Sequence, residues 1–275
     1  RDSPEGVKPD GDYSGQYVIM AHREGAASFF LDQDDDDPEG DKRPRLVATI
    51  DELAPEQVTV TYQPGARIAW IASAVSGAIT RVGISMGLDP KQTVLFDAGN
   101  LFMTGLDTGV DARDVAFDER STNAERTYVL SRSPESILVT TRNPVGDELT
   151  FVPPQLPICS GPSRLRVELF ELEGGEGRLL GFVTCFDGRS VEIVDLDGAR
   201  SITRSTNVSG AFEFVLDQAR ERMYLADFST STLRIFDLAP LKACLSPLST
   251  GSDEECAPTL LGIVGIPQAV SELPR

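Results

Sequence analysis

The feature that most constrains the fold of this chain is a phrase of two strand-like runs that recurs five times. Each copy has an apolar, β-branched or aromatic run, a short polar turn with Gly, Ser or Pro, and a second such run, which is the pattern of a β-hairpin. The copies are YVIMAHREGAASFFLD (17–32), AWIASAVSGAITRV (69–82), YVLSRSPESILVTT (128–141), LGFVTCFDGRSVEIVD (180–195) and YLADFSTSTLRIFDL (224–238). Their starts are 52, 59, 52 and 44 residues apart, a spacing typical of four-stranded repeats with loops of variable length.

Further strand-like runs flank the hairpins, while helical periodicity of useful length is almost absent. Inner strands are expected before four hairpins, at 57–62, 113–118, 165–171 and 212–217, and outer strands after the first two, at 46–51 and 101–106. We predict an all-β fold, a single β-propeller domain over residues 1–275 built from four-stranded antiparallel blades. The five blades are expected at approximately 1–52, 53–110, 111–160, 161–208 and 209–275.

The two ends of the chain complement each other in this scheme. Residues 267–273 (PQAVSEL) have the pattern of an inner strand with no hairpin after it, and residues 1–16 lead into a hairpin with no inner strand before it. We therefore expect the C-terminal strand to latch the ring, since closure removes exposed sheet edges. A chain trimmed at its start would have lost further blades, up to a total of seven.

One stretch of the sequence resembles a known family of repeats. Residues 222–238 (RMYLADFSTSTLRIFDL) are similar to the repeat of the YVTN-type β-propellers, in which an apolar Tyr-Val strand, a polar turn and an apolar strand ending in Asp recur around a ring. Ala226 and Asp227 stand where that signature has Thr-Asn. The resemblance implies a propeller of the cell envelope or a secreted one, usually with six to eight blades.

The charge balance excludes one class of partner. The chain has 43 acidic and 25 basic residues, a net charge of −18 and a pI near 4.4. A polyanion would be repelled over most of such a surface, so nucleic-acid binding is not expected. No apolar run is long enough to span a membrane. A signal peptide or lipid anchor would have to lie outside this chain.

The four cysteines indicate an oxidising compartment. Cys159 precedes an expected inner strand and Cys185 ends the strand that returns along it, so the two should meet. Cys244 and Cys256 flank the polar loop LSPLSTGSDEE, which a local bridge would shorten. We favour this pairing over the other two that four cysteines allow and over free thiols in a reducing cytoplasm. It places the chain in the periplasm, at the outer-membrane surface or outside the cell.

The sequence offers few residues for chemistry. Asp32, Asp34 and Asp36 in the run DQDDDDPEGD are candidate calcium ligands, although a solvated acidic loop explains them as well. His22 is the only histidine, and a blade-end position explains it better than a catalytic triad does. The run GISMG (83–87) has GxSxG spacing, but no helical pattern follows it, so a nucleophile elbow lacks support, and no nucleotide-binding glycine loop joins a strand to a helix. No cofactor is expected besides the candidate calcium ion.

Two functions from different classes follow. The first is a non-enzymatic scaffold, docked to other proteins of a cell-envelope assembly through the long loops 142–162 and 240–258. The alternative is a metal-dependent hydrolase of the lactonase kind with a carboxylate site on the inner strands. The candidate carboxylates are Asp118, Glu168, Glu171, Glu213 and Asp217. Scarce catalytic residue types favour the scaffold.

Overall fold

A computed structural model describes most of the chain in two compact units. Residues 1–129 with 139–152 make up the first unit, and residues 130–138 with 153–275 make up the second. The described residues are 17–31, 45–63, 66–74, 77–86, 92–104, 110–118, 120, 126–142, 148–171, 177–206, 208–245 and 256–265. No helix among these residues is long and apolar enough to cross a membrane.

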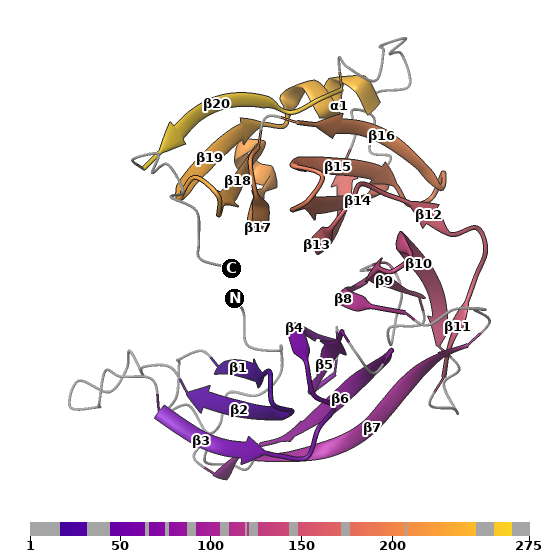
Figure 1. Ribbon diagram of the computed structural model, residues 1–275, viewed down its shortest axis with the longest axis vertical. Helices are drawn as coiled ribbons and strands as arrows, with labels where there is room; N and C mark the ends of the chain where they lie inside the picture. The colour runs from indigo at the N-terminus through magenta and orange to yellow at the C-terminus, as the bar shows by residue number, and fades with distance from the viewer. Residues whose placement is uncertain are drawn as a thin grey trace. The chain divides into compact units, whose positions relative to one another are not determined.

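The first unit contains a small sheet and most of a large one (Figure 1). The small sheet has the order β1-β2-β3, with β1 at Tyr17–His22, β2 at Ala26–Leu31 and β3 at Arg45–Ile50. The large sheet has the order β4-β5-β6-β7-β11-β10-β9-β8, and β12 pairs with β10. Its strands are β4 Gln57–Tyr62, β5 Ile68–Ser73, β6 Ala78–Ser85, β7 Val94–Thr104, β8 Ala112–Phe117, β9 Arg126–Arg132, β10 Glu135–Arg142, β11 Glu148–Phe151 and β12 Leu156–Pro157.

The second unit contains two sheets of four antiparallel strands, each in sequence order (Figure 1). The strands are β13 Pro162–Glu171, β14 Gly177–Cys185, β15 Ser190–Asp195, β16 Arg200–Ser205, β17 Ala211–Asp217, β18 Arg222–Asp227, β19 Thr232–Asp237 and β20 Thr259–Val264. A 3-10 helix at Gln218–Arg220 joins β17 to β18, and the short helix α1 at Ala239–Leu245 follows β19. Each sheet is therefore a meander whose first strand lies at one edge.

β-Bulges recur at matching places in the sheets, which supports the internal repeat. The first strands β4, β13 and β17 each shift register near their start, so that Val58, Ser163 and Phe212 are extra residues. Outer pairs shift as well, between β2 and β3, β6 and β7, β15 and β16, and β19 and β20. A bulge turns side chains and increases the twist of the strand that carries it.

Apolar side chains fill the space between successive sheets within each unit. In the second unit, Phe182 of β14, Phe214 of β17 and Phe236 of β19 are almost fully buried in one cluster. In the first, Phe29 of β2 and Ile71 of β5 share another. Middle strands are consequently buried on both faces, which explains why they read as continuous apolar runs rather than as alternating ones.

The all-β fold class with four-stranded antiparallel sheets is confirmed, and the expected hairpins correspond to five pairs of strands. One difference concerns β7, which runs over Val94–Thr104 instead of 101–106 and pairs in parallel with β11. This pairing joins two expected blades into one sheet, because β7 is long enough to reach past β6. Residues 267–273 lie outside the described part, so the latch, the blade count and the single domain stay predictions.

Candidate functional site

Three of the acids proposed for a metal site each have their own partner. Asp118, directly after β8, accepts hydrogen bonds from Nη2 and Nε of Arg120 at 2.9 and 3.0 Å. Glu168 of β13 accepts one from Nε2 of Gln218 at 2.9 Å. Asp217, at the end of β17, accepts one from a neighbouring arginine at 2.6 Å. Each of these three carboxylates thus accepts a hydrogen bond from a different side chain.

A carboxylate metal site does not fit the described residues. Among them, no three His, Cys, Asp or Glu side chains come close enough to hold a metal ion. An arginine beside a carboxylate also disfavours a cation there, because it brings a positive charge of its own. His22 Nε2 lies 2.7 Å from Ser28 Oγ, which accounts for this histidine. The side chain of Glu171 and the candidate calcium ligands Asp32, Asp34 and Asp36 lie outside the described residues.

Glu213 differs from the other predicted acids because two arginines of the neighbouring strand hold it. Its Oε2 accepts a hydrogen bond from Nε of Arg164 at 2.9 Å, and its Oε1 accepts one from Nη2 of Arg166 at 3.2 Å. Both arginines come from β13, where alternate residues point to the same side. The Glu213 side chain is 41% exposed and that of Arg164 is 16% exposed. The cluster is therefore fixed in position and open to solvent.

Aromatic rings adjoin this charged cluster. The guanidinium carbon of Arg164 lies 4.9 Å from the ring centroid of Phe212, a cation–π contact. Phe212 in turn lies 6.3 Å from Phe228, and Phe228 lies 6.2 Å from Phe186. Phe212 is 41% exposed and Phe228 is 65% exposed. A row of aromatic rings thus extends from the arginine–glutamate cluster into solvent.

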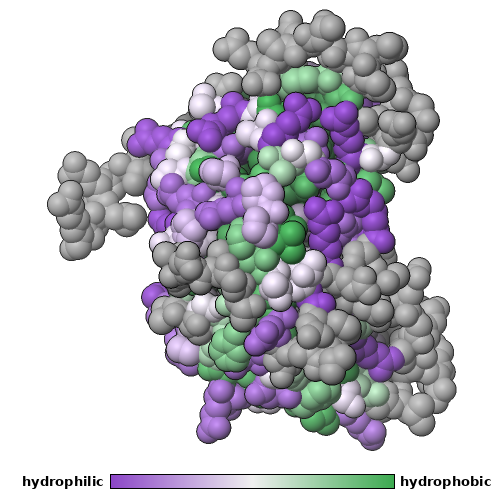
Figure 2. Space-filling model, turned by 90° about the vertical axis from the view of Figure 1, so that its right-hand side faces the viewer, coloured by the Kyte–Doolittle hydropathy of each residue, from purple (hydrophilic) through white to green (hydrophobic). Residues whose placement is uncertain are grey.

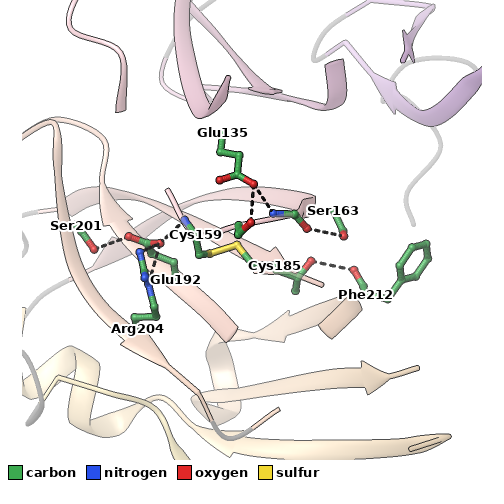
Figure 3. Close-up of a disulfide and its surroundings, with 11 residues drawn as sticks. Glu135, Cys159, Ser163, Cys185, Glu192, Ser201, Arg204 and Phe212 are labelled. Atoms are coloured by element: carbon green, nitrogen blue, oxygen red, sulfur yellow. Dashed lines mark hydrogen bonds and ion pairs between the residues drawn. A yellow bond between two sulfur atoms is a disulfide. The ribbon is translucent and has the colours of Figure 1, made fainter. Parts of the chain in front are cut away.

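A hydrogen bond and a nearby disulfide hold the backbone at Phe212, the residue before Glu213 (Figure 3). Phe212 is the extra residue of the β17 bulge, and its carbonyl accepts a hydrogen bond from Oγ1 of Thr184 at 2.9 Å. Cys185, which follows Thr184, is bonded to Cys159, and this is the pairing that the sequence analysis favours. This disulfide joins the end of β14 to the segment that leads into β13, and so it supports the strand that carries both arginines.

A buried glutamate fixes the other side of the disulfide (Figure 3). Glu192 of β15 is almost fully buried and accepts a hydrogen bond from the backbone N–H of Cys159 at 2.7 Å. It also accepts hydrogen bonds from Ser201 Oγ and from Arg204 Nη2, both at 2.8 Å. A buried carboxylate with several charge-assisted hydrogen bonds is a rigid anchor. Its role here is structural.

The second predicted disulfide is also present, and its cysteines lie C-terminal to all residues of the arginine–glutamate cluster. Cys244 of α1 is bonded to Cys256, and residues 246–255 between them lie outside the described part. A pocket of about 280 Å³ lies beside α1. Its lining includes Lys242 and Glu221, whose Nζ and Oε1 atoms are 2.9 Å apart. The polar groups of this pocket thus satisfy one another.

The first unit has a related pair that the sequence analysis did not propose. Oγ1 of Thr59 on β4 donates a hydrogen bond to Oδ1 of Asp114 on β8 at 3.1 Å. Asp114 also accepts a bond from the N–H of the next residue, Val115, as Glu213 does from Phe214. Asp114 is fully buried, whereas Glu213 is not. Asp114 could have been proposed from the sequence, because residues four apart in a strand point to the same side and Asp118 was already a candidate.

Asp118 leads to a prediction about stability at low pH. Burial by itself raises the pKa of this carboxyl group, but hydrogen bonds and charge from Arg120 outweigh burial and lower the pKa overall. A carboxyl group whose pKa is lowered on folding stabilises the folded state at pH values above the pKa of an ordinary aspartate, which is near 4. This contribution is lost as the pH falls through the folded-state pKa.

We expect Asp118→Asn to lower the free energy of unfolding at pH 7 by about 2 kcal/mol, because two charge-assisted hydrogen bonds are lost. Urea denaturation from pH 7 to pH 2 measures this difference. It should shrink below about pH 4, where the carboxyl group is protonated first in the unfolded state and then, at lower pH, in the folded state. A difference that stays constant down to pH 2 would contradict the account.

Comparisons with solved structures find β-propellers. A protein from Bacteroides uniformis, provisionally named 6-phosphogluconolactonase, has a TM-score of 0.59 and 14% identity, over 95% of this chain and 70% of that one. The periplasmic gluconolactonase PpgL of Pseudomonas aeruginosa has a TM-score of 0.50 and 12% identity, over 91% and 82%. The propeller domain of Cps50 (Swd1) from Myceliophteria thermophila has a TM-score of 0.51 and 11% identity, over 93% and 69%. No family model and no curated protein matches the sequence.

At these identities the similarity shows only that the fold is of the β-propeller type. It does not show that the chain belongs to the YVTN family. It nevertheless corrects the preference for a non-enzymatic scaffold, which is wrong as the leading function. Proteins named as lactonases are among the similar structures, and they favour the alternative. The scaffold hypothesis rested on scarce catalytic residue types. That argument overlooked arginine, which needs no histidine beside it to stabilise negative charge.

Proposed function

We propose that this protein is a hydrolase that opens the lactone of a sugar acid at the cluster of Arg164, Arg166 and Glu213. The observation that carries the proposal is a solvent-accessible glutamate on the first strand of one sheet that is held by two arginines on the first strand of the neighbouring sheet. The lactonase names among proteins of similar fold support it. A bound metal ion is not part of the proposal.

The chemistry needs a base and a positive environment. In lactone hydrolysis, water adds to the carbonyl carbon, negative charge develops on the carbonyl oxygen, the bond to the ring oxygen breaks, and that oxygen is protonated. Glu213 takes the proton from water and returns it to the leaving ring oxygen. Arg164 and Arg166 stabilise the charge on the carbonyl oxygen. Each arginine has five N–H donors, so the bonds to Glu213 leave donors for a substrate.

The location of the protein belongs to the same proposal. Two disulfides are typical of proteins outside the reducing cytoplasm. Disulfide-bonded strands beside the cluster would keep the site intact there. We therefore place the protein in the periplasm, at the outer-membrane surface or outside the cell, in the setting that a YVTN-like propeller of the envelope would have.

The five-bladed ring with a C-terminal latch is also kept as a proposal. Its support is that the β1–β3 sheet has three described strands where each sheet of the second unit has four, and that Val18 and Met20 of β1 are exposed. Deleting residues 266–275 should then lower the free energy of unfolding by about 3 kcal/mol, since several cross-strand pairs are lost at roughly 0.2–1 kcal/mol each. Thermal unfolding checks this, with deletion of residues 1–10 as the control. Equal effects of the two deletions would rule the latch out.

The test of the function is a panel of lactones offered to the purified protein. Initial rates of acid release are measured for glucono-1,5-lactone, its 6-phosphate and an aliphatic δ-lactone, each corrected for spontaneous hydrolysis. We expect catalysis of the sugar lactones and at least tenfold lower kcat/KM for the aliphatic compound, which lacks hydroxyl groups for the arginines and glutamate. Equal rates for all three would contradict a sugar-acid site.

A further inference from the structure

The aromatic row beside Glu213 carries an inference about the size of the substrate. We propose that Phe228 and Phe212 form a subsite for a second sugar ring, so that the substrate is the lactone of a disaccharide aldonic acid. This inference rests on the proposed function and makes it more specific. The structure leaves Phe228 65% exposed and Phe212 41% exposed, side by side at 6.3 Å.

The backbone that carries Phe228 is held in place although the side chain is exposed. Its backbone N–H donates to the carbonyl of Gly210 at 2.9 Å, and its own carbonyl accepts a bond from Ser231 at 3.3 Å. A turn in the neighbouring sheet is built in the same way: Phe186 donates to the carbonyl of Gly161 at 2.9 Å and accepts from Arg189 at 3.3 Å. Both aromatic residues therefore open a β-turn that is tied to the loop before a first strand. Such preorganisation lowers the cost of binding.

The rings do not stack on one another, although Arg164 lies over one face of Phe212. Phe228 is inclined by 47° to Phe212 and by 56° to Phe186, so none of the three rings covers another face to face. An aromatic face carries partial negative charge, which attracts the slightly positive C–H groups on the apolar side of a pyranose. Phe212 and Phe228 are two neighbouring exposed aromatic side chains, and contiguous exposed apolar groups mark binding sites.

Charged groups at the end of the row suit a sugar better than an apolar ligand. Asp187 follows Phe186, and its Oδ2 lies 2.6 Å from Nη2 of Arg132. Both side chains are about half exposed, at 50% and 41%. Carboxylate and guanidinium groups beside an aromatic ring can bind the hydroxyl groups of a sugar while the ring contacts its C–H face. At the other end of the row, Glu213 and the two arginines receive the lactone.

The order of the groups defines how the substrate would lie. Arg164 contacts Phe212, Phe212 contacts Phe228, and Phe228 contacts Phe186. A lactone ring at the arginines therefore places its substituent over Phe212 and Phe228. A monosaccharide lactone would leave these rings uncovered. A disaccharide lactone would cover them and gain binding energy remote from the reacting carbonyl.

The experiment compares kcat/KM for cellobiono-1,5-lactone and glucono-1,5-lactone in the wild type and in Phe228→Ala. We expect the wild type to prefer the disaccharide lactone, and Phe228→Ala to reduce the ratio of the two values about tenfold, as the loss of one aromatic contact predicts. Phe228→Trp should keep the preference. Phe102→Ala, which removes an exposed phenylalanine of β7, should leave both values unchanged.

A binding measurement separates the two levels of the proposal. Titration calorimetry with cellobionic acid, the ring-opened product, should show binding to the wild type that weakens about tenfold in Phe228→Ala. Hydrolysis of both lactones with a ratio that Phe228→Ala does not change would overturn the second-ring subsite and leave the lactonase function standing. Hydrolysis of neither lactone, with cellobionic acid still bound through Phe228, would overturn the lactonase function and retain the sugar site.

Discussion

Replacing Glu213 by Gln should lower kcat/KM for glucono-1,5-lactone about 100-fold, because the site loses the group that takes a proton from the attacking water. The amide has nearly the same shape, and the N–H of Phe214 and both arginines remain beside it. Thermal unfolding should change little, since the side chain is 41% exposed. Steady-state rates over a range of lactone concentrations measure the effect.

Glu168→Gln is the matched control for this variant. Glu168 also lies on a first strand and also accepts a side-chain hydrogen bond, in its case from Gln218. Its kcat/KM should stay within about twofold of the wild-type value. If Glu168→Gln lost as much activity as Glu213→Gln, or if Glu213→Gln kept full activity, Glu213 would not be the base.

Replacing both Cys159 and Cys185 by Ala should lower the free energy of unfolding by about 3.5 kcal/mol. The bridge closes a loop with a sequence separation of 26 residues, and the chain-entropy account gives that value for a loop of this length. Denaturant unfolding under non-reducing conditions measures it. KM for lactones should also rise, because Thr184 next to Cys185 supports the carbonyl of Phe212.

The Cys244–Cys256 bridge gives the comparison. It closes a shorter loop, with a separation of 12 residues, so its removal should cost about 3 kcal/mol. It supports α1 and not the strands of the arginine–glutamate cluster. Kinetic constants should then remain at wild-type values at temperatures where the variant is folded. A rise in KM that is the same in both double variants would argue that the first bridge has no special relation to the site.

The strands could be predicted because local patterns determine them. The run that became β18 and β19 has apolar residues, a polar turn and apolar residues again, and hairpins need only neighbours in sequence to form. The pairing of β7 with β11 could not be predicted in this way, because a parallel contact between distant segments depends on strand length and position. The Cys159–Cys185 disulfide followed from strand direction, since Cys185 ends the strand that returns along β13, and Cys244–Cys256 followed from the loop between them.

The site was predictable only in part. Strand position identified Glu213 as a candidate, but its partners Arg164 and Arg166 were not singled out. Their contact lies between the first strands of two sheets, at a sequence separation that no local pattern records. Phe212 and Phe228 were also not distinguished from core residues, because a bulge and a turn, rather than alternation, decide their exposure.

The most direct measurement is the rate at which the wild-type protein opens glucono-1,5-lactone and its 6-phosphate, compared with the spontaneous rate and with Glu213→Gln in the same assay. The account predicts acid release that is proportional to wild-type protein concentration, saturates with lactone, and falls about 100-fold in the variant. Acid release at the spontaneous rate, or equal catalysis by both proteins, would contradict the claim that the arginine–glutamate cluster is a lactone-hydrolysing site.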